Sequence, residues 1–206
     1  MTQLTLYYAP RTRSFTALWL LEELGLPYTL EAFSLATGRH KQPDFLALNP
    51  MGKVPVVVRD GVAMSEAAAI AIALADLHPE AGLGVGIDDP LRPAWLRWHF
   101  FAAAIIEPAL MERFTGATPN PRTYAWGSFD EMVRVATAGV QDGWLLGERF
   151  TSADIITGAG LDFGIKFGAI AKEGAIAEYV ARLRARPAYQ RALAIEAEQV
   201  ARLLPG

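Results

Sequence analysis

The feature that most constrains the fold is a short apolar hairpin with a proline at its start. The β-branched run at residues 56–58 is bounded by Pro55 before it and by Asp60-Gly61 after it, and a second short apolar run follows at 62–64. Asp-Gly between two apolar runs is the strongest short-range hairpin signal that a sequence offers. The segment therefore predicts two antiparallel strands that pair with each other.

Pro55 is the unusual residue of this hairpin. A proline cannot donate to a strand ladder, so it belongs at the first residue of a strand or on an edge strand. We predict a cis Val54–Pro55 bond, which would turn the backbone N–H and C=O of Val54 away from the sheet, beside the start of the next helix. Such a turn fits a small peptide-like ligand that carries a carboxylate. In the alternative reading, the hairpin is an ordinary one and its proline only protects an edge strand.

A helix is predicted directly after the hairpin. Ser65 and Glu66 precede a run of good helix formers at 67–74. A serine followed by an acid suits a helix N-terminus, where unpaired N–H groups and the helix dipole favour both side chains. We expect this helix to end at about residue 77.

Strand and helix patterns alternate through the first part of the chain. The predicted elements are, in order, a strand at 4–8, a helix at 15–24, a strand at 28–33, a helical turn at about 45–48, the hairpin strands at 56–58 and 62–64, and the helix at 65–77. Strands that alternate with helices imply a parallel pair, and the hairpin adds antiparallel strands. We therefore expect one mixed sheet with helices on its faces.

The second half of the chain has helical patterns and no convincing strand. A stretch rich in proline and glycine at 79–90 indicates a linker, and helical patterns follow at 95–114, 129–145, 155–170, 176–183 and 187–203. Thr151 and Asp154 are spaced like a capping box before the third of these helices. The predicted organisation is an α/β domain at 1–78, a linker at 79–90 and an all-α helical bundle at 91–206.

Composition limits the classes of function. Of the 206 residues, 52% are hydrophobic and 20% are charged, and the net charge is −3 without a basic run, so no nucleic-acid partner is indicated. The chain has no cysteine, which removes disulfides, thiolate metal sites and a protein-thiol nucleophile. Its 3 histidines are not paired at ligand spacing, so no metal site is predicted. Without a signal-peptide pattern or a membrane-length apolar run, we expect a soluble cytoplasmic protein with no membrane partner.

The whole chain resembles the glutathione transferases. The resemblance rests on the strand-opening proline, on the pair before the third helix, on the Thr151 and Asp154 box, and above all on residues 37–55, which are similar to phi-class enzymes and their bacterial relatives. It implies a thioredoxin-like N-terminal domain of order βαβαββα. It also implies a glutathione S-transferase in which glutathione, as co-substrate, attacks a small hydrophobic electrophile. A two-fold homodimer is the usual assembly.

The resemblance assigns glutathione contacts to eight residues of the N-terminal domain. The backbone of Val54, before Pro55, would pair with the cysteinyl unit, and the residues that open the third helix would hold the γ-glutamyl end. The full set of implied contacts is His40, Lys41, Lys53, Val54, Pro55, Ser65, Glu66 and Ala67. The basic and polar residues His40, Lys41 and Lys53 would face the glycyl carboxylate, while the helix N-terminus meets the other carboxylate. The alternative roles are solvated surface charge for the lysines and a helix N-cap partner for Glu66.

The implied chemistry requires a glutathione thiolate, because the thiol itself is a poor nucleophile. Lowering a thiol pKa of about 8.5 by two units requires roughly 2.7 kcal/mol of preference for the anion. A charge-assisted hydrogen bond contributes about 1.5–3 kcal/mol and a helix N-terminus about 0.3–1 kcal/mol. One hydroxyl group near a helix start is therefore sufficient.

Three hydroxyl groups are candidates for this role. Thr12 lies two residues after Pro10, where phi-like relatives place the serine of a Pro-x-Ser motif. Ser14 follows the position, here Arg13, at which beta-class enzymes carry cysteine. Tyr7 is taken to end the first strand, as the catalytic tyrosine of the tyrosine-type classes does. We expect Thr12 to act, ahead of Ser14 and Tyr7. The alternatives are N-capping for the first two and a half-buried strand position for Tyr7.

The electrophile site is expected between the domains, with Trp98, Phe101, Phe114 and Trp126 as candidate lining. Residues 67–73 and 95–106 are the expected dimer surfaces.

Two other functions use the same scaffold: a glutathione-dependent peroxidase, isomerase or dehalogenase, and a non-catalytic binding module. The absence of cysteine argues against an oxidoreductase that works through its own thiol. Threonine at the serine position, and Ala67 where many relatives carry serine, leave the non-catalytic alternative open.

Overall fold

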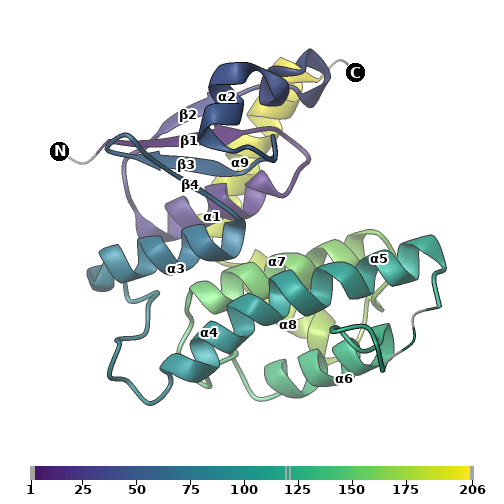
Figure 1. Ribbon diagram of the computed structural model, residues 1–206. Helices are drawn as coiled ribbons and strands as arrows, with labels where there is room; N and C mark the ends of the chain where they lie inside the picture. The colour runs from purple at the N-terminus through teal and green to yellow at the C-terminus, as the bar shows by residue number, and fades with distance from the viewer. Residues whose placement is uncertain (1–2, 119, 121, 205–206) are drawn as a thin grey trace. The chain divides into compact units, whose positions relative to one another are not determined.

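The computed structural model describes residues 3–118, 120 and 122–204, which divide into two compact units (Figure 1). The first unit extends through Ala81 and resumes at Arg186. The second unit is Gly82–Ala185. The expected two-part fold, an α/β thioredoxin-like part and a helical part, is confirmed.

A four-stranded mixed sheet forms the centre of the first unit. Its strands are β1 (Leu4–Tyr8), β2 (Thr29–Ala32), β3 (Val56–Arg59) and β4 (Val62–Ser65), in the spatial order β2-β1-β3-β4. β1 is parallel to β2 and antiparallel to β3, and β3 is antiparallel to β4. The predicted hairpin turns at Asp60 and Gly61, whose φ angles are 49° and 84°. Both angles are positive, as a tight two-residue hairpin turn requires.

Helices cover both faces of this sheet (Figure 1). On one face lies α2 (Pro43–Leu48), where the buried Phe45 ring meets the rings of Tyr7 and Phe33 edge-on. Side chains alternate along a strand, so Leu6 and Tyr8 point to the opposite face and are fully buried. That face carries α1 (Ser14–Leu24) and α3 (Ala67–Leu77).

The last helix, α9 (Pro187–Leu203), packs in the first unit. Arg186 donates two hydrogen bonds to the Glu23 carboxylate at 2.6 and 2.8 Å, and the Tyr189 ring meets the Trp19 ring edge-on at 5.0 Å. This placement differs from the prediction, which put residues 187–203 in the all-α domain. An amphipathic pattern indicates that a helix has a buried face and does not identify the element that covers it.

The second unit is helical. Its main helices are α4 (Arg92–Phe101), α5 (Glu107–Thr115), α6 (Phe129–Val140), α7 (Ser152–Lys166) and α8 (Ala175–Arg184). Most side chains of α7 are buried, so α7 is the core helix of this unit. The single helix predicted at 95–114 contains a π-helical turn at Ala102–Ile106. Pro108 follows that turn, and because proline has no N–H it cannot donate to the Ala104 carbonyl, which interrupts the α-helical ladder.

The predicted capping box opens α7. The Thr151 N–H donates to one oxygen of the buried Asp154 carboxylate at 2.9 Å. The other oxygen accepts from the Leu145 N–H and from the Tyr179 hydroxyl, both at 2.9 Å. Burial raises the pKa of the Asp154 carboxyl group, against the effect of these donors. One side chain therefore ties the start of α7 to the preceding loop and to α8.

Candidate functional site

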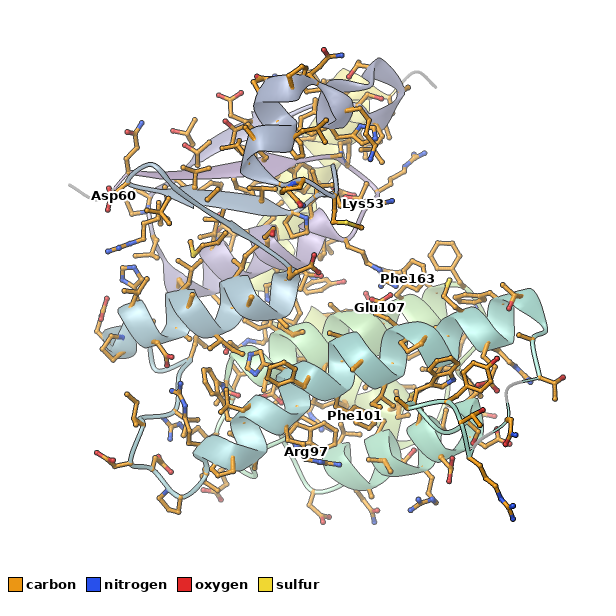
Figure 2. All side chains as sticks on the ribbon, in the orientation of Figure 1. Lys53, Asp60, Arg97, Phe101, Glu107 and Phe163 are labelled. Carbon is orange, nitrogen blue, oxygen red and sulfur yellow. The ribbon has the colours of Figure 1, made fainter. Side chains whose placement is uncertain are left out.

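Strand register brings three segments of the first unit to the same end of the sheet. Tyr7 pairs with Val56, and Val56 pairs with Ser65. Because these strands are antiparallel, the segments after β1, before β3 and after β4 leave the sheet side by side. Figure 2 shows Lys53 at this end of β3 and the hairpin turn with Asp60 at the other. All eleven site residues that the sequence predicted lie in this unit, in β1 and the segments around this end.

The Val54–Pro55 peptide bond is cis, as predicted. Val54 lies just before β3, and its main chain forms no hydrogen bond with another described residue. A half-buried peptide unit normally pairs with the protein, with water or with a ligand. The N–H and C=O groups of Val54 are therefore free to pair with a peptide-like ligand, in the manner of strand addition.

The turn before Val54 is held by Asn49, a residue that the sequence analysis did not single out. Its side-chain amide donates to the Lys53 carbonyl at 2.9 Å and accepts from the Met51 N–H at 3.1 Å. Gly52 has a φ of 60°, and a Cβ atom there would lie 2.7 Å from the His40 carbonyl oxygen. The signal in the sequence was the Asn-Pro-Met-Gly turn itself, since asparagine side chains bond the backbone two residues on.

The predicted cations gather around this turn. The Lys41 ammonium donates to the Met51 carbonyl at 3.1 Å, and the 3-10 helix Arg39–Lys41 packs against Gly52. The Lys53 side chain is exposed and has no ion pair with a described residue, and the Nδ1 atom of His40 is buried without a partner among those residues. This edge is positively charged, which suits a carboxylate.

Glu66 begins α3 in a conformation that is rare for a residue with a side chain. Its φ and ψ are 66° and 114°, and Ser65 and Ala67 on either side end β4 and begin α3. Its exposed carboxylate does not cap the helix and pairs with no other described residue. Such backbone conformations cost of order 1–3 kcal/mol and concentrate at ligand sites. Here the carboxylate is available to a cation, while the first N–H groups of α3 are available to an anion.

The hydroxyl groups of Thr12 and Ser14 form one network with Ala9. Each donates to the Ala9 carbonyl oxygen, at 2.7 and 2.9 Å, and the two hydroxyl oxygens lie 2.8 Å apart. The Ser14 oxygen also accepts from the Ala9 N–H at 3.1 Å, and the Thr12 oxygen accepts from the Ser14 N–H at 3.1 Å. Ser14 is fully buried, whereas Thr12 is half-buried. Because Ser14 alone can satisfy the carbonyl, the Thr12 proton can turn toward a ligand.

The tyrosine at the end of β1 is Tyr8, one residue beyond the position that the sequence analysis considered. Tyr7 is half-buried and packs against Phe45 on the α2 face. Tyr8 is fully buried on the opposite face, and its hydroxyl has no partner among the described residues. The signal was the strand pattern at 4–8, whose last residue is Tyr8. The Tyr8 phenol is enclosed, whereas Tyr7 and Thr12 are both half-buried and Tyr7 lies on the α2 face.

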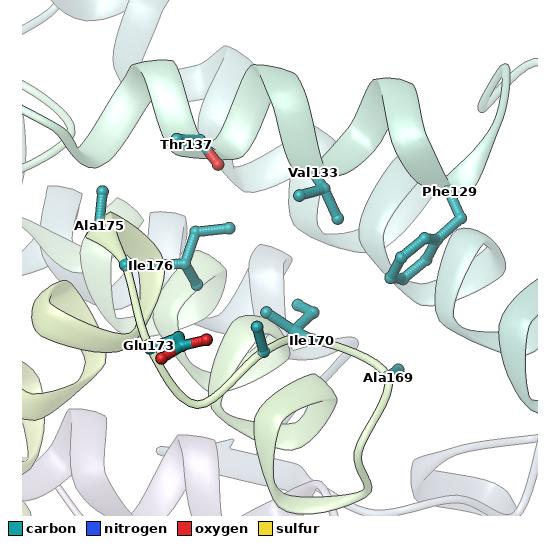
Figure 3. A pocket seen from close by; sticks show the side chains of 10 residues that line it. Phe129, Val133, Thr137, Ala169, Ile170, Glu173, Ala175 and Ile176 are labelled. Atoms are coloured by element: carbon teal, nitrogen blue, oxygen red, sulfur yellow. The ribbon is translucent and has the colours of Figure 1, made fainter.

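A separate hollow in the second unit has a volume of about 230 Å³ (Figure 3). It lies between α6 and the segment that joins α7 to α8, and its lining is mostly apolar. Its polar side chains are those of Thr137 and the exposed Glu173. No pair of groups suited to acid–base or nucleophilic catalysis meets there. Within the described part of the chain, moreover, no cluster of three or more His, Asp or Glu side chains could hold a metal ion, and no helix is long and apolar enough to cross a membrane.

The chain is similar to known proteins both in sequence and in structure. The family model for the N-terminal domain of glutathione S-transferases matches residues 12–77. The chain is similar to glutathione S-transferase GST-4.5 of Xanthomonas campestris, with 31% identity over 157 residues that cover 75% of this chain and 76% of that protein. It is 28% identical to the disulfide-bond oxidoreductase YfcG of Escherichia coli, over 91% of this chain and 93% of that protein. A crystal structure of a glutathione transferase from Methylococcus capsulatus is 29% identical and superposes with a TM-score of 0.78 over 95% of this chain and 99% of that one.

Proposed function

Because this chain belongs to the glutathione S-transferase family, we propose that it binds glutathione beside Val54 and joins its sulfur to a small hydrophobic electrophile. The observation that carries this proposal is the main chain of Val54, which has no hydrogen-bond partner among the described residues and lies at the same end of the sheet as a helix start without a side-chain cap. A tripeptide with a carboxylate at each end requires this combination of a backbone partner, a helix N-terminus and cations.

Each part of glutathione has a complementary group in this unit. The cysteinyl N–H and C=O pair with the main chain of Val54. The carboxylate of the γ-glutamyl residue accepts hydrogen bonds from the first N–H groups of α3, at Ala67 and beyond. The ammonium group of the same residue pairs with the Glu66 carboxylate. The glycyl carboxylate lies against Lys41 and Lys53. Ser65 and Pro55 support the two segments, and His40 adds a donor beside the lysines.

The Thr12 hydroxyl stabilises the thiolate in this proposal. In the free protein it donates to the Ala9 carbonyl, which Ser14 can satisfy alone. In the complex the Thr12 proton turns to the sulfur, and the thiol proton leaves to solvent. The thiolate then attacks the electrophilic carbon, an S–C bond forms, and the leaving group departs with the electrons of its former bond. Ser14 and Tyr7 remain the alternative donors.

The second unit carries a partly exposed aromatic cluster. The rings of Phe163 and Phe167 are 4.3 Å apart, and the Phe114 ring lies 6.0 and 6.3 Å from them. Phe167 is 64% exposed, so this surface offers aromatic contacts to a small molecule. Of the expected lining residues, Phe114 belongs to this cluster. Trp98 and Phe101 are buried in the core of the unit, and Trp126 bonds the Glu112 carboxylate.

Similarity to the disulfide-bond oxidoreductase YfcG favours a second candidate function, reduction of a disulfide by glutathione. The chain has no cysteine, so both reducing electrons would come from glutathione. One glutathione thiolate would attack the disulfide and release a thiolate. A second would then cleave the mixed disulfide and form oxidised glutathione. The same Thr12 hydroxyl would serve both reactions, and assays with an aryl halide and with a model disulfide distinguish them.

Glutathione is expected to stabilise the protein, and Glu66→Gln should weaken its binding. A ligand at 100 times its Kd adds about 2.7 kcal/mol to the free energy of unfolding, which is measured as a rise in Tm. Glu66→Gln keeps the size of the side chain and removes its charge, so we expect Kd to rise by about five- to tenfold, or about 1–1.4 kcal/mol. A glutathione analogue without the amino group should bind both proteins alike.

The matched control is Glu31→Ala, which removes an exposed acid of β2 in the same unit. It should leave the glutathione affinity unchanged. If glutathione produces no thermal shift in the wild-type protein, the proposed site is wrong. A shift without any turnover of the aryl halide or the disulfide would instead support the non-catalytic binding module.

We also propose a two-fold homodimer. Helix α3 exposes Leu77 and helix α4 exposes Phe100, which are 47% and 62% exposed in the single chain. A two-fold interface must be self-complementary, so each apolar side chain needs a partner on the other copy. Light scattering should give twice the chain mass, and Phe100→Glu should shift the mass toward that of one chain. A wild-type mass of one chain at all concentrations would contradict the proposal.

A further inference from the structure

A residue of the last helix holds the loop that carries Thr12. The Arg11 N–H donates to the Glu196 carboxylate at 2.8 Å, across 185 positions of sequence. Arg11 has a φ of 59°, in the left-handed region that residues with side chains rarely adopt. A charge-assisted bond to a backbone N–H is among the stronger hydrogen bonds in proteins. It therefore acts on the one residue of this loop whose conformation is unfavourable.

We propose that Glu196 is a positioning residue for the thiolate-stabilising hydroxyl. The carboxylate fixes the backbone of Arg11 in the left-handed conformation, and this conformation sets the direction in which the chain leaves toward Thr12. The inference rests on the proposed function, in which Thr12 donates to the glutathione sulfur. It makes α9, which the sequence assigned to the helical domain, a part of the thiol site.

The other contacts of α9 indicate that Glu196 is not needed to attach the helix. Arg186 binds Glu23, Arg191 binds the Glu22 carboxylate at 2.8 Å, and Tyr189 packs on the aromatic rings of α1. These contacts all come from the first part of α9 and fix it against α1. The bond from Glu196 is made farther along the helix and reaches the loop instead. Its effect therefore falls on the loop.

The environment of the Glu196 carboxylate supports the same role. One oxygen accepts from Arg11, and the other is buried without a partner among the described residues. Burial raises the pKa of this carboxyl group, and the bond from the Arg11 N–H opposes that rise. The one directed interaction of the carboxylate is with the loop.

The experiment compares two substitutions at Glu196 with two controls on the same helix. Glu196→Ala removes the acceptor, whereas Glu196→Gln keeps a side-chain carbonyl oxygen for the Arg11 N–H. Glu198→Ala removes an exposed acid two residues away, and Arg191→Ala loosens α9 from α1 without touching the loop. The readouts are amide exchange at Arg11 in the free protein, the pH titration of the thiolate absorbance of bound glutathione, and kcat and KM.

Glu196→Ala is expected to speed exchange of the Arg11 amide and to raise the apparent thiol pKa by about half a unit to one unit, equivalent to about a three- to tenfold loss of thiolate. The kcat should fall by a similar factor, while KM for glutathione stays within about twofold. Glu196→Gln should behave like the wild type. Arg191→Ala should lower Tm and leave the thiol pKa in place, and Glu198→Ala should change neither. In combination with Thr12→Ala, Glu196→Ala should add little further loss.

Two results would overturn the proposal. In one, Glu196→Ala lowers Tm as Arg191→Ala does and leaves the thiol pKa unchanged. In the other, its effect adds in full to that of Thr12→Ala, which would mean that it acts elsewhere. The wild-type protein separates this inference from the proposed function. A wild-type complex without thiolate absorbance overturns both, whereas normal absorbance that Glu196→Ala does not shift overturns the role of Glu196 alone.

Discussion

Thr12→Ala lowers kcat/KM for a model aryl halide by tenfold or more, which corresponds to about 1.4 kcal/mol per decade of transition-state stabilisation. Glutathione affinity changes little, because the main chain of Val54 and the Glu66 carboxylate are intact. The hydroxyl acts on the sulfur and not on the peptide frame. The measurement is the pH–rate profile, in which the apparent thiol pKa moves upward when the hydroxyl is lost.

The other hydroxyl groups provide the controls for this result. Thr12→Ser keeps the donor and should retain most of the activity. Ser14→Ala removes a buried partner of the Ala9 carbonyl, so it should lower stability with a smaller effect on the thiol pKa. Tyr7→Phe should have the least effect, and Tyr8→Phe tests the phenol at the end of β1. If Ser14→Ala shifts the thiol pKa and Thr12→Ala does not, the roles of the two residues are exchanged.

Asp154→Ala is expected to destabilise the second unit by about 3 kcal/mol or more, because it leaves several buried donors without an acceptor. The carboxylate accepts from Leu145, Thr151 and Tyr179, and it caps α7, the core helix of the unit. Loss of a helix cap alone costs about 1 kcal/mol. The measurement is the midpoint of urea unfolding of the second unit, compared between the variant and the wild type at a constant m value.

Milder substitutions keep this prediction testable if Asp154→Ala does not fold. Asp154→Asn retains one acceptor oxygen and should lose less stability than the alanine variant. Tyr179→Phe removes one donor together with its need for an acceptor and should cost about 1 kcal/mol. The control is Asp142→Ala, an exposed acid in the same unit, which is expected to change stability by less than about 0.5 kcal/mol. Equal midpoints for Asp154→Asn, Tyr179→Phe and Asp142→Ala would contradict the expected loss of stability.

Local patterns were sufficient for the secondary structure and for one part of the site. The hairpin turn at Asp60-Gly61 and the break before Pro55 follow from the conformational preferences of adjacent residues. The helix predicted from residue 65 begins at Ala67 instead, because Ser65 pairs in β4 and Glu66 has a non-helical backbone conformation without a side-chain cap. The sheet topology followed as well, because only a few connections are compatible with strands and helices in this order. The candidate contacts at Val54 and Glu66 belong to these same turns, so they could be located before the structure was considered.

Local patterns could not determine which of the two residues, Thr12 or Ser14, is buried, or which surface α9 covers. Ser14 is buried and Thr12 is half-buried although they are two residues apart, because the start of α1 turns one of them inward against Ala9. The bond between Arg11 and Glu196 joins residues 185 positions apart, and neither residue carries a periodic or motif signal that names the other. The sequence by itself determined the elements, their order and the turns of the site, since these depend on neighbouring residues. Only the tertiary structure decided which half of the chain receives α9 and which carboxylate holds the Thr12 loop, because those choices depend on packing between distant segments.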